Sequence, residues 1–280
     1  MRTALLLGLM AGLVLAAGGL VGGRTGLLVA LAVAVGVNGW AWYRSDRLAL
    51  RAMRAFPVTE TQAPGLYAVV RELATRARQP MPRLYVSPTD QPNAFATGRT
   101  PRRAAVCCTQ GVLELLDRRQ LRAVLAHELS HVYNRDVLLG SVAGALAAVV
   151  TYLAHLATVG ALVGERSEER EGGLLGALLL VLLGPLAAGL VRLAVSRNRE
   201  YEADADGARL CGDPLALAAA LRRIGEGAAT RPLPADDRLV AQSHLMIAAP
   251  CRASGLAALL STHPPMAERI ARLERMAREG

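Results

Sequence analysis

The chain of 280 residues contains no lysine, so all 32 of its basic residues are arginine. Aromatic residues are also scarce, at 4%, although 52% of the chain is hydrophobic. A hydrophobic excess made of Leu, Ala, Val and Gly is more typical of membrane-spanning helices than of an aromatic-rich core. Despite the formal net charge of +9, no basic run is interleaved with aromatics, which argues against nucleic-acid binding.

Cysteine is represented by Cys107, Cys108, Cys211 and Cys251. None of them forms a C-x-x-C pair, and the adjacent Cys107 and Cys108 are poor candidates for an ordinary disulfide. We expect small buried side chains in a reducing compartment. The cysteines therefore carry little information about function.

Long apolar segments are the dominant feature, and they lie at residues 4–22, 27–42, 137–164 and 173–195. The last two exceed the roughly 20 residues that a helix needs to cross a bilayer. A cleaved signal peptide is the alternative for the first segment, but a second apolar segment follows it almost at once. A helical hairpin is the better interpretation.

Arginine distribution predicts the orientation of these spans. The stretches 44–135 and 197–280 are rich in arginine, whereas the loop 165–171 carries four Glu against two Arg. The positive-inside rule then places both termini in the cytoplasm of a prokaryotic cell, with four spans in its plasma membrane. The expected organisation is an N-terminal membrane hairpin (1–43), a first cytoplasmic catalytic part (44–136), a second hairpin (137–195) and a second catalytic part (196–280).

The cytoplasmic parts read as a small mixed domain, so the expected fold class is α+β and mainly helical. Residues 63–78 place Leu66, Val69, Val70 and Leu73 on one helical face. Two short strands are expected at "RLYVSP" and "AAVCCTQ", with "PNAFATG" between them as a strand or turn. "DRRQLRAVLAHELSHVYNR" is a clear helix.

That helix carries a His-Glu-x-x-His cluster. Residues four apart lie on one helix face, so His127 and His131 can both bind one metal ion. Glu128 lies beside them as a general base for the water whose pKa zinc lowers. Two surface histidines without a metal are the alternative.

A catalytic zinc normally takes a third protein ligand, and "SRNREYEADADGA" offers one. Glu200 and Asp204 share a helix face, whereas Glu202 falls opposite and Asp206 is displaced from both. The economical assignment is Glu200 as ligand, with Asp204 accepting a ring N–H from a ligand histidine. An exposed acidic helix start is the alternative. A membrane hairpin between 137 and 195 would bring His131 and Glu200 together.

The motifs "NAFATG", "HELSHVYNRDVL", "RNREYEADADGA" and "LLSTHPPMAERIARLERMA" together resemble the HtpX family of membrane zinc endopeptidases, which are relatives of the CAAX prenyl endopeptidases. The resemblance covers nearly the whole chain. It implies one Zn²⁺ per chain, a zincin-like integral membrane metalloprotease, and quality control of damaged or misfolded membrane proteins.

The resemblance also implies residue roles. Glu200 is similar to the family's third zinc ligand and Asp204 to its partner, while Asn93 is similar to a residue that holds the substrate backbone. His263 is similar to the group that hydrogen-bonds the oxyanion, although by itself it reads as a turn histidine before two prolines. Arg269 would brace its segment.

The expected substrates are proteins or peptides, with an extended segment lying along an edge strand near "NAFATG" or "AVCCTQ". Two other functions stay open: a prenyl-protein endopeptidase, for which four spans are few, and a zinc-binding membrane scaffold without catalysis. The sequence names no physiological substrate and no oligomeric state.

Overall fold

The computed structural model describes residues 46–136, 197–231, 245–247 and 264–279, with scattered positions from 25 to 44. The expected spans lie outside these residues, apart from those scattered positions in the second span. Within the described part of the chain, no helix has both the length and the hydropathy needed to cross a bilayer. The number and orientation of spans therefore stay predictions.

Two helices follow the sequence pattern closely. Helix α2 (Pro64–Arg76) begins with proline, whose fixed φ suits a first helical position, and it buries the four predicted residues together with Ala74. Helix α4 (Arg118–Tyr133) begins at Asp117, whose side chain accepts from the Gln120 backbone, and the Gln120 side chain accepts from the Asp117 backbone in return. This capping box satisfies two backbone N–H groups at the start of the helix that carries the His-Glu-x-x-His cluster.

The sheet has four strands, in the order β1-β2-β4-β3. They are β1 (Phe56–Pro57), β2 (Arg83–Ser87), β3 (Ala94–Thr97) and β4 (Ala105–Thr109). β2 and β4 are parallel, and the other two pairs are antiparallel. The two predicted strands are confirmed, and "PNAFATG", expected as a strand or a turn, supplies strand β3. The expectation that "AVCCTQ" could offer a free edge is wrong. The chain returns through a 3-10 turn (η1, Pro101–Arg103), so β3 pairs outside β4 and takes the edge itself.

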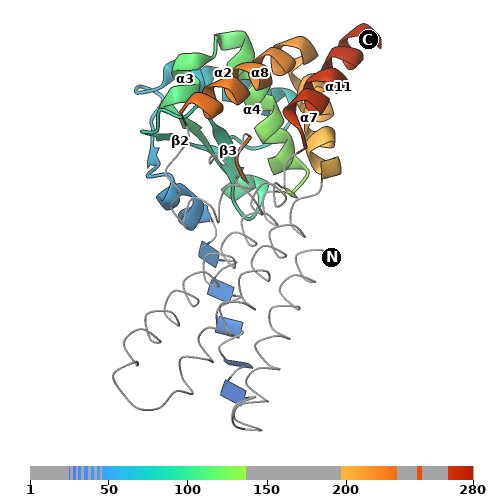
Figure 1. Ribbon diagram of the computed structural model, residues 1–280. Coiled ribbons are helices and arrows are strands. Elements are labelled where there is room, and N and C mark those ends of the chain that lie inside the picture. Colours follow the sequence, from blue (N-terminus) through green and yellow to red (C-terminus); the bar gives the residue numbers. More distant parts are fainter. Residues whose placement is uncertain are drawn as a thin grey trace, which may run out of the picture.

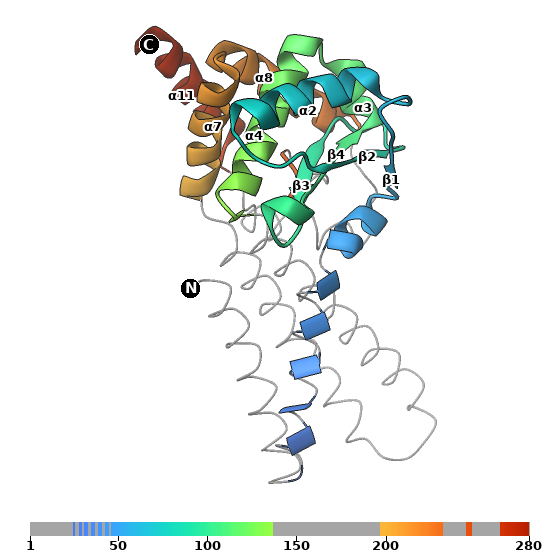
Figure 2. The same cartoon turned by 180° about the vertical axis from the view of Figure 1, so that it is seen from behind.

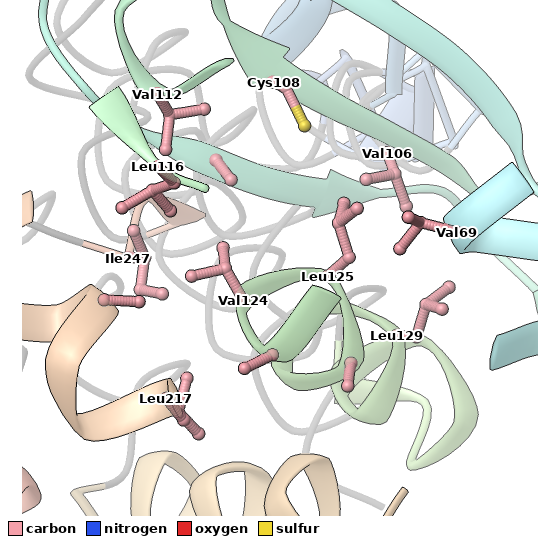
Figure 3. Packing of buried hydrophobic residues seen from close by; sticks show 14 of the residues in the cluster. Val69, Val106, Cys108, Val112, Leu116, Val124, Leu125, Leu129, Leu217 and Ile247 are labelled. Carbon is pink, nitrogen blue, oxygen red and sulfur yellow. The ribbon is translucent and has the colours of Figure 1, made fainter. Parts of the chain in front are cut away.

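Both faces of β4 are buried, and its side chains alternate between two hydrophobic clusters, as a pleated strand requires. Val106 and Cys108 join the larger cluster with α2 and α4, and Figure 3 shows them on the same side as Val124 and Leu125 of α4. Ala105 and Cys107 point into a smaller cluster on the opposite face, formed with Ala49, Leu50, Met53, Phe95 and Met246. The helix that ends near residue 52 therefore packs against the face of the sheet that α4 leaves free.

Helix α4 is covered on its outer side by α7 (Arg197–Cys211) and α8 (Pro214–Thr230), and α11 (Met266–Glu279) packs on both. Short helix α3 (Gln110–Leu115) follows β4. Figures 1 and 2 show the helices stacked over the sheet, with the helix that ends near residue 52, which we call the N-terminal helix, leading away on the opposite side. A Cβ on Gly207 of α7 would stand 2.7 Å from His127 Cα. The missing side chain lets α7 approach the backbone of α4 at His127.

Candidate metal centre

The two histidines of α4 project from adjacent turns, as their spacing predicts. Their ring centroids are 4.8 Å apart and the rings meet edge to face, at 87°. His127 is 1% exposed and Glu128 2%, while His131 is partly exposed. The two imidazoles therefore reach solvent on the His131 side, whereas residues 123–130 of α4 are buried.

Glu200, in the first turn of α7, completes the group. Its carboxylate lies 3.4 Å from His131 Nε2 through Oε1 and 3.9 Å from His127 Nε2 through Oε2. One donor atom from each of the three residues falls within 4.8 Å of the others. Donors on a tetrahedral zinc lie about 3.3 Å apart, given bonds of about 2.0–2.1 Å. Two imidazoles and a carboxylate in this arrangement fit Zn²⁺ in both chemistry and size.

Asp204 lies one turn after Glu200 and reaches the far side of the first histidine. His127 Nδ1 is 3.0 Å from Asp204 Oδ1, and no other described residue bonds this buried nitrogen. The charge complement makes Asp204 the acceptor for an Nδ1–H. That tautomer leaves the Nε2 lone pair of His127 for a metal ion.

Arg269 of α11 connects the same groups. The fully buried guanidinium donates from Nε to Asp204 Oδ2 (2.8 Å) and from Nη2 to Asp204 Oδ1 (2.7 Å). Its Nη1 is 3.3 Å from Glu200 Oε2, and its Nη2 is 3.3 Å from His127 Nε2. Arg269 was expected to brace its own segment. It instead contacts the candidate metal ligands and Asp204 directly.

Glu128 is buried beside the donor group. Burial, together with the neighbouring Glu200 carboxylate, raises the pKa of Glu128 to about 8, whereas His131, Arg269 and the backbone N–H of Ala96 act to lower it. The Ala96 contact ties the carboxylate to β3, the edge strand. Glu128 is therefore held between the strand and the histidines.

The histidines themselves have different electrostatic surroundings. Burial lowers the pKa of His127. For His131, burial acts in the same direction, but the carboxylates of Asp136, Glu200 and Glu128 outweigh it and raise its pKa to about 9. Asp136 Oδ2 is 3.7 Å from His131 Nδ1, so each histidine faces an aspartate on its Nδ1 side.

Asn93, expected at the substrate backbone, is fully buried at the start of β3. Its Oδ1 accepts from the Ala94 N–H, and its backbone N–H and C=O bond to Thr109 of β4. In these contacts Asn93 fixes the end of the edge strand. His263 lies outside the described residues, so its role as oxyanion donor stays a prediction.

Two residues that shape this site, Asp136 and Gly207, were not assigned from the sequence. Asp136 follows α4 by three residues, and a carboxylate so close after a metal-binding histidine could have signalled a ring partner. Gly207 follows Glu200 by seven residues, two helical turns on the same face, and that spacing was the available signal for close helix packing.

Comparison with known proteins gives a consistent result. The model of peptidase family M48 matches residues 60–277. A "Protease HtpX homolog" of Kineococcus radiotolerans is 58% identical over 90% of this chain and 86% of that protein. One of Pseudarthrobacter chlorophenolicus is 52% identical over 99% of this chain and 96% of its own. The crystal structure of S. mikatae Ste24p is similar with a TM-score of 0.42 and 18% identity, over 89% of this chain and 65% of that one. A structural likeness at that level supports no inference.

Proposed function

The chain belongs to peptidase family M48 and is a metallopeptidase, and we propose that it is a zinc-dependent endopeptidase embedded in a prokaryotic plasma membrane. It would cleave membrane or misfolded proteins on the cytoplasmic side. The observation that carries this proposal is the meeting of His127, His131 and Glu200 around one point. Segments distant in the sequence supply these donors, and a buried carboxylate accompanies them.

The donor set supports zinc. His127 and His131 would bind through Nε2 and Glu200 through its carboxylate, while Asp204 orients the first imidazole. When bound, zinc supplies a Lewis acid that polarises the scissile carbonyl and lowers the pKa of water. Three protein ligands leave a fourth position open, which is the pattern of catalytic rather than structural sites.

Glu128 is the general base in this proposal. Its carboxylate adjoins the donor group and would take a proton from the attacking water, then pass that proton to the leaving amine. The contact with the Ala96 N–H keeps the carboxylate beside the edge strand. His263, outside the described residues, is the expected hydrogen-bond donor to the oxyanion.

The sheet suggests where the substrate lies. On the outer edge of β3, Ala94 O accepts from the Ile247 N–H (3.2 Å), so part of that edge is already paired with the chain itself. Glu128 holds the Ala96 N–H one repeat further along. We place an extended substrate segment beside β3 from Ala96 onward, next to the general base. Main-chain hydrogen bonding there implies modest sequence specificity.

The decisive experiment compares Glu128→Gln with the wild-type protein purified in detergent. The variant should keep about one zinc per chain and lose about 10²–10⁴-fold of its casein cleavage, because the ligands remain while the base is gone. Glu226→Gln, an exposed change on α8, should alter neither quantity. Full cleavage by Glu128→Gln would refute the mechanism.

The same preparation separates the alternatives. A scaffold without catalysis would bind zinc and cleave nothing, and a chelator would then have no activity to abolish. A prenyl-protein endopeptidase would cleave a prenylated C-terminal peptide in preference to unmodified casein. The proposed function requires chelator-sensitive cleavage of unprenylated protein.

A further inference from the structure

The N-terminal helix presents apolar side chains outward. Among the residues that the structure describes, eight large hydrophobic residues are exposed, and six of them belong to this helix: Leu28, Val29, Leu31, Val35, Trp40 and Tyr43. Trp and Tyr concentrate where the bilayer meets water. Trp40 and Tyr43 therefore mark the depth of the lipid headgroups on this helix.

The loop 98–103 of the catalytic part contacts this helix near Tyr43. The Arg99 guanidinium lies 4.5 Å from the centroid of the Tyr43 ring, a cation–π distance. Arg83 makes a second connection between the loop and the helix: its Nη2 donates to Asp46 Oδ2 (3.1 Å) and to the carbonyl of Arg103 (3.2 Å). Both ends of the loop 98–103 are thus tied to residues 43–46 of the N-terminal helix. Figure 2 shows the segment after β3 on the same side of the sheet-and-helix unit as this helix.

The loop has a fixed shape that turns its arginines outward. Gly98 has φ +131°, and a Cβ there would stand 2.7 Å from the Arg103 carbonyl, so the two ends of the loop touch. Arg102 and Arg103 are exposed. Neither makes a salt bridge to any residue that the structure describes. Arg135, after α4, lines a small void together with Gly98 and Arg99 and adds positive charge beside them.

From these contacts we propose that the loop 98–103 is a binding surface for anionic phospholipid headgroups. This inference rests on the membrane location in the proposed function. Guanidinium groups suit phosphate geometry, and Arg102 and Arg103, exposed at headgroup depth, would each raise the local preference for anionic lipid by roughly five-fold. The opposing acidic groups nearby are engaged: Asp46 with Arg83, and Asp136 with Arg199 and His131.

The loop follows directly after the edge strand. β3 ends at Thr97, one residue before the loop, and Ala96 contacts the general base. Lipid held at 98–103 would therefore fix the height of the substrate-binding edge above the bilayer. The bound lipid acts as a positioning contact for the whole catalytic part.

The test uses the two tryptophans of the chain, Trp40 and Trp42, as reporters in the full-length protein. The protein is reconstituted with phosphatidylcholine (PC) or phosphatidylglycerol (PG) brominated near the top of the acyl chains, and quenching gives the relative affinity of the two lipids beside the helix. The wild-type protein should prefer PG several-fold, and Arg102→Gln/Arg103→Gln should lower that preference toward one. The control pair Arg118→Gln/Arg278→Gln removes the same charge from the distal end of α4, about 24 Å from the loop, and from α11.

Each outcome has a definite meaning. Equal quenching of the wild-type protein by PC and PG, or equal loss of preference in both double variants, overturns the lipid-binding loop and leaves the membrane protease intact. Quenching by neither lipid overturns the membrane location and with it the proposed function. A preference lost only in Arg102→Gln/Arg103→Gln, and weakened by salt in the wild-type protein, supports the proposal.

Discussion

Arg269 holds Asp204 through two parallel hydrogen bonds, of 2.8 and 2.7 Å, in a fully buried position behind the metal-binding group. Burial alone would raise the pKa of Asp204, but the charge and hydrogen bonds of Arg269, together with His127, hold it below its ordinary value. The aspartate is therefore ionised and fixed in direction. Asp204 can then accept a hydrogen bond from Nδ1 of His127.

Removing the arginine should destabilise the protein strongly. Arg269→Met leaves Asp204 as a buried carboxylate without its partner, and such a loss costs about 3–5 kcal/mol. Arg275→Met is the matched control on the same helix, because Arg275 is exposed and makes no salt bridge to any residue that the structure describes. Thermal unfolding of the two variants measures the difference. Similar midpoints would show that the buried pair contributes little.

Asp204→Asn should weaken zinc binding while preserving the shape of the side chain. The amide carries no charge to favour the Nδ1–H tautomer of His127, and loss of such a partner typically costs about 10–100-fold in metal affinity. Glu202→Gln removes a carboxylate from the exposed face of the same helix and should leave affinity unchanged. Competition with a chromophoric chelator gives both constants. Equal affinities would assign Asp204 a purely structural role.

The shared face of His127 and His131 on α4 and the amphipathic helices could be predicted from local spacing, because i and i+4 positions and hydrophobic periodicity depend only on the chain itself. The order of the strands could not. The burial pattern does not tell β3 from β4, because both strands are fully buried. Which of them lies at the edge depends on how the chain returns through η1. The position of Arg269 was equally hidden, because one arginine in an Arg-rich helix carries no sign that its partner Asp204 lies 65 residues earlier.

Cys107 and Cys108 should be inert to alkylation in the folded protein. Both are completely buried, and burial raises the pKa of Cys108 to about 12. At pH 8 only about one molecule in 10⁴ would carry the Cys108 thiolate, which is the reactive form. Mass spectrometry after iodoacetamide treatment should find both unmodified, and both modified after denaturation. Thr75→Cys, at an exposed position of α2, serves as the reactive control; native labelling of Cys108 at a similar rate would contradict the packing.

Gly207→Ala should damage both stability and the metal centre. The added methyl would meet His127 Cα at 2.7 Å and His127 N at 2.8 Å, and backbone atoms cannot move aside as a flexible side chain can. We expect a loss of about 1–3 kcal/mol from overpacking, with weaker zinc binding because α7 carries Glu200 away from α4.

Gly225→Ala is the matched control for this change. It lies within α8, where the nearest atom that a Cβ would meet is Met266 Cγ at 3.9 Å. With room for the methyl, the substitution should stabilise its helix by about 0.5–1 kcal/mol, because alanine restricts the unfolded chain and favours helix. Thermal unfolding should therefore show lower stability for Gly207→Ala and higher stability for Gly225→Ala. Zinc titration should show weaker binding for Gly207→Ala alone. Tolerance of alanine at 207 would mean that the contact between α7 and α4 is looser than the distances to His127 imply.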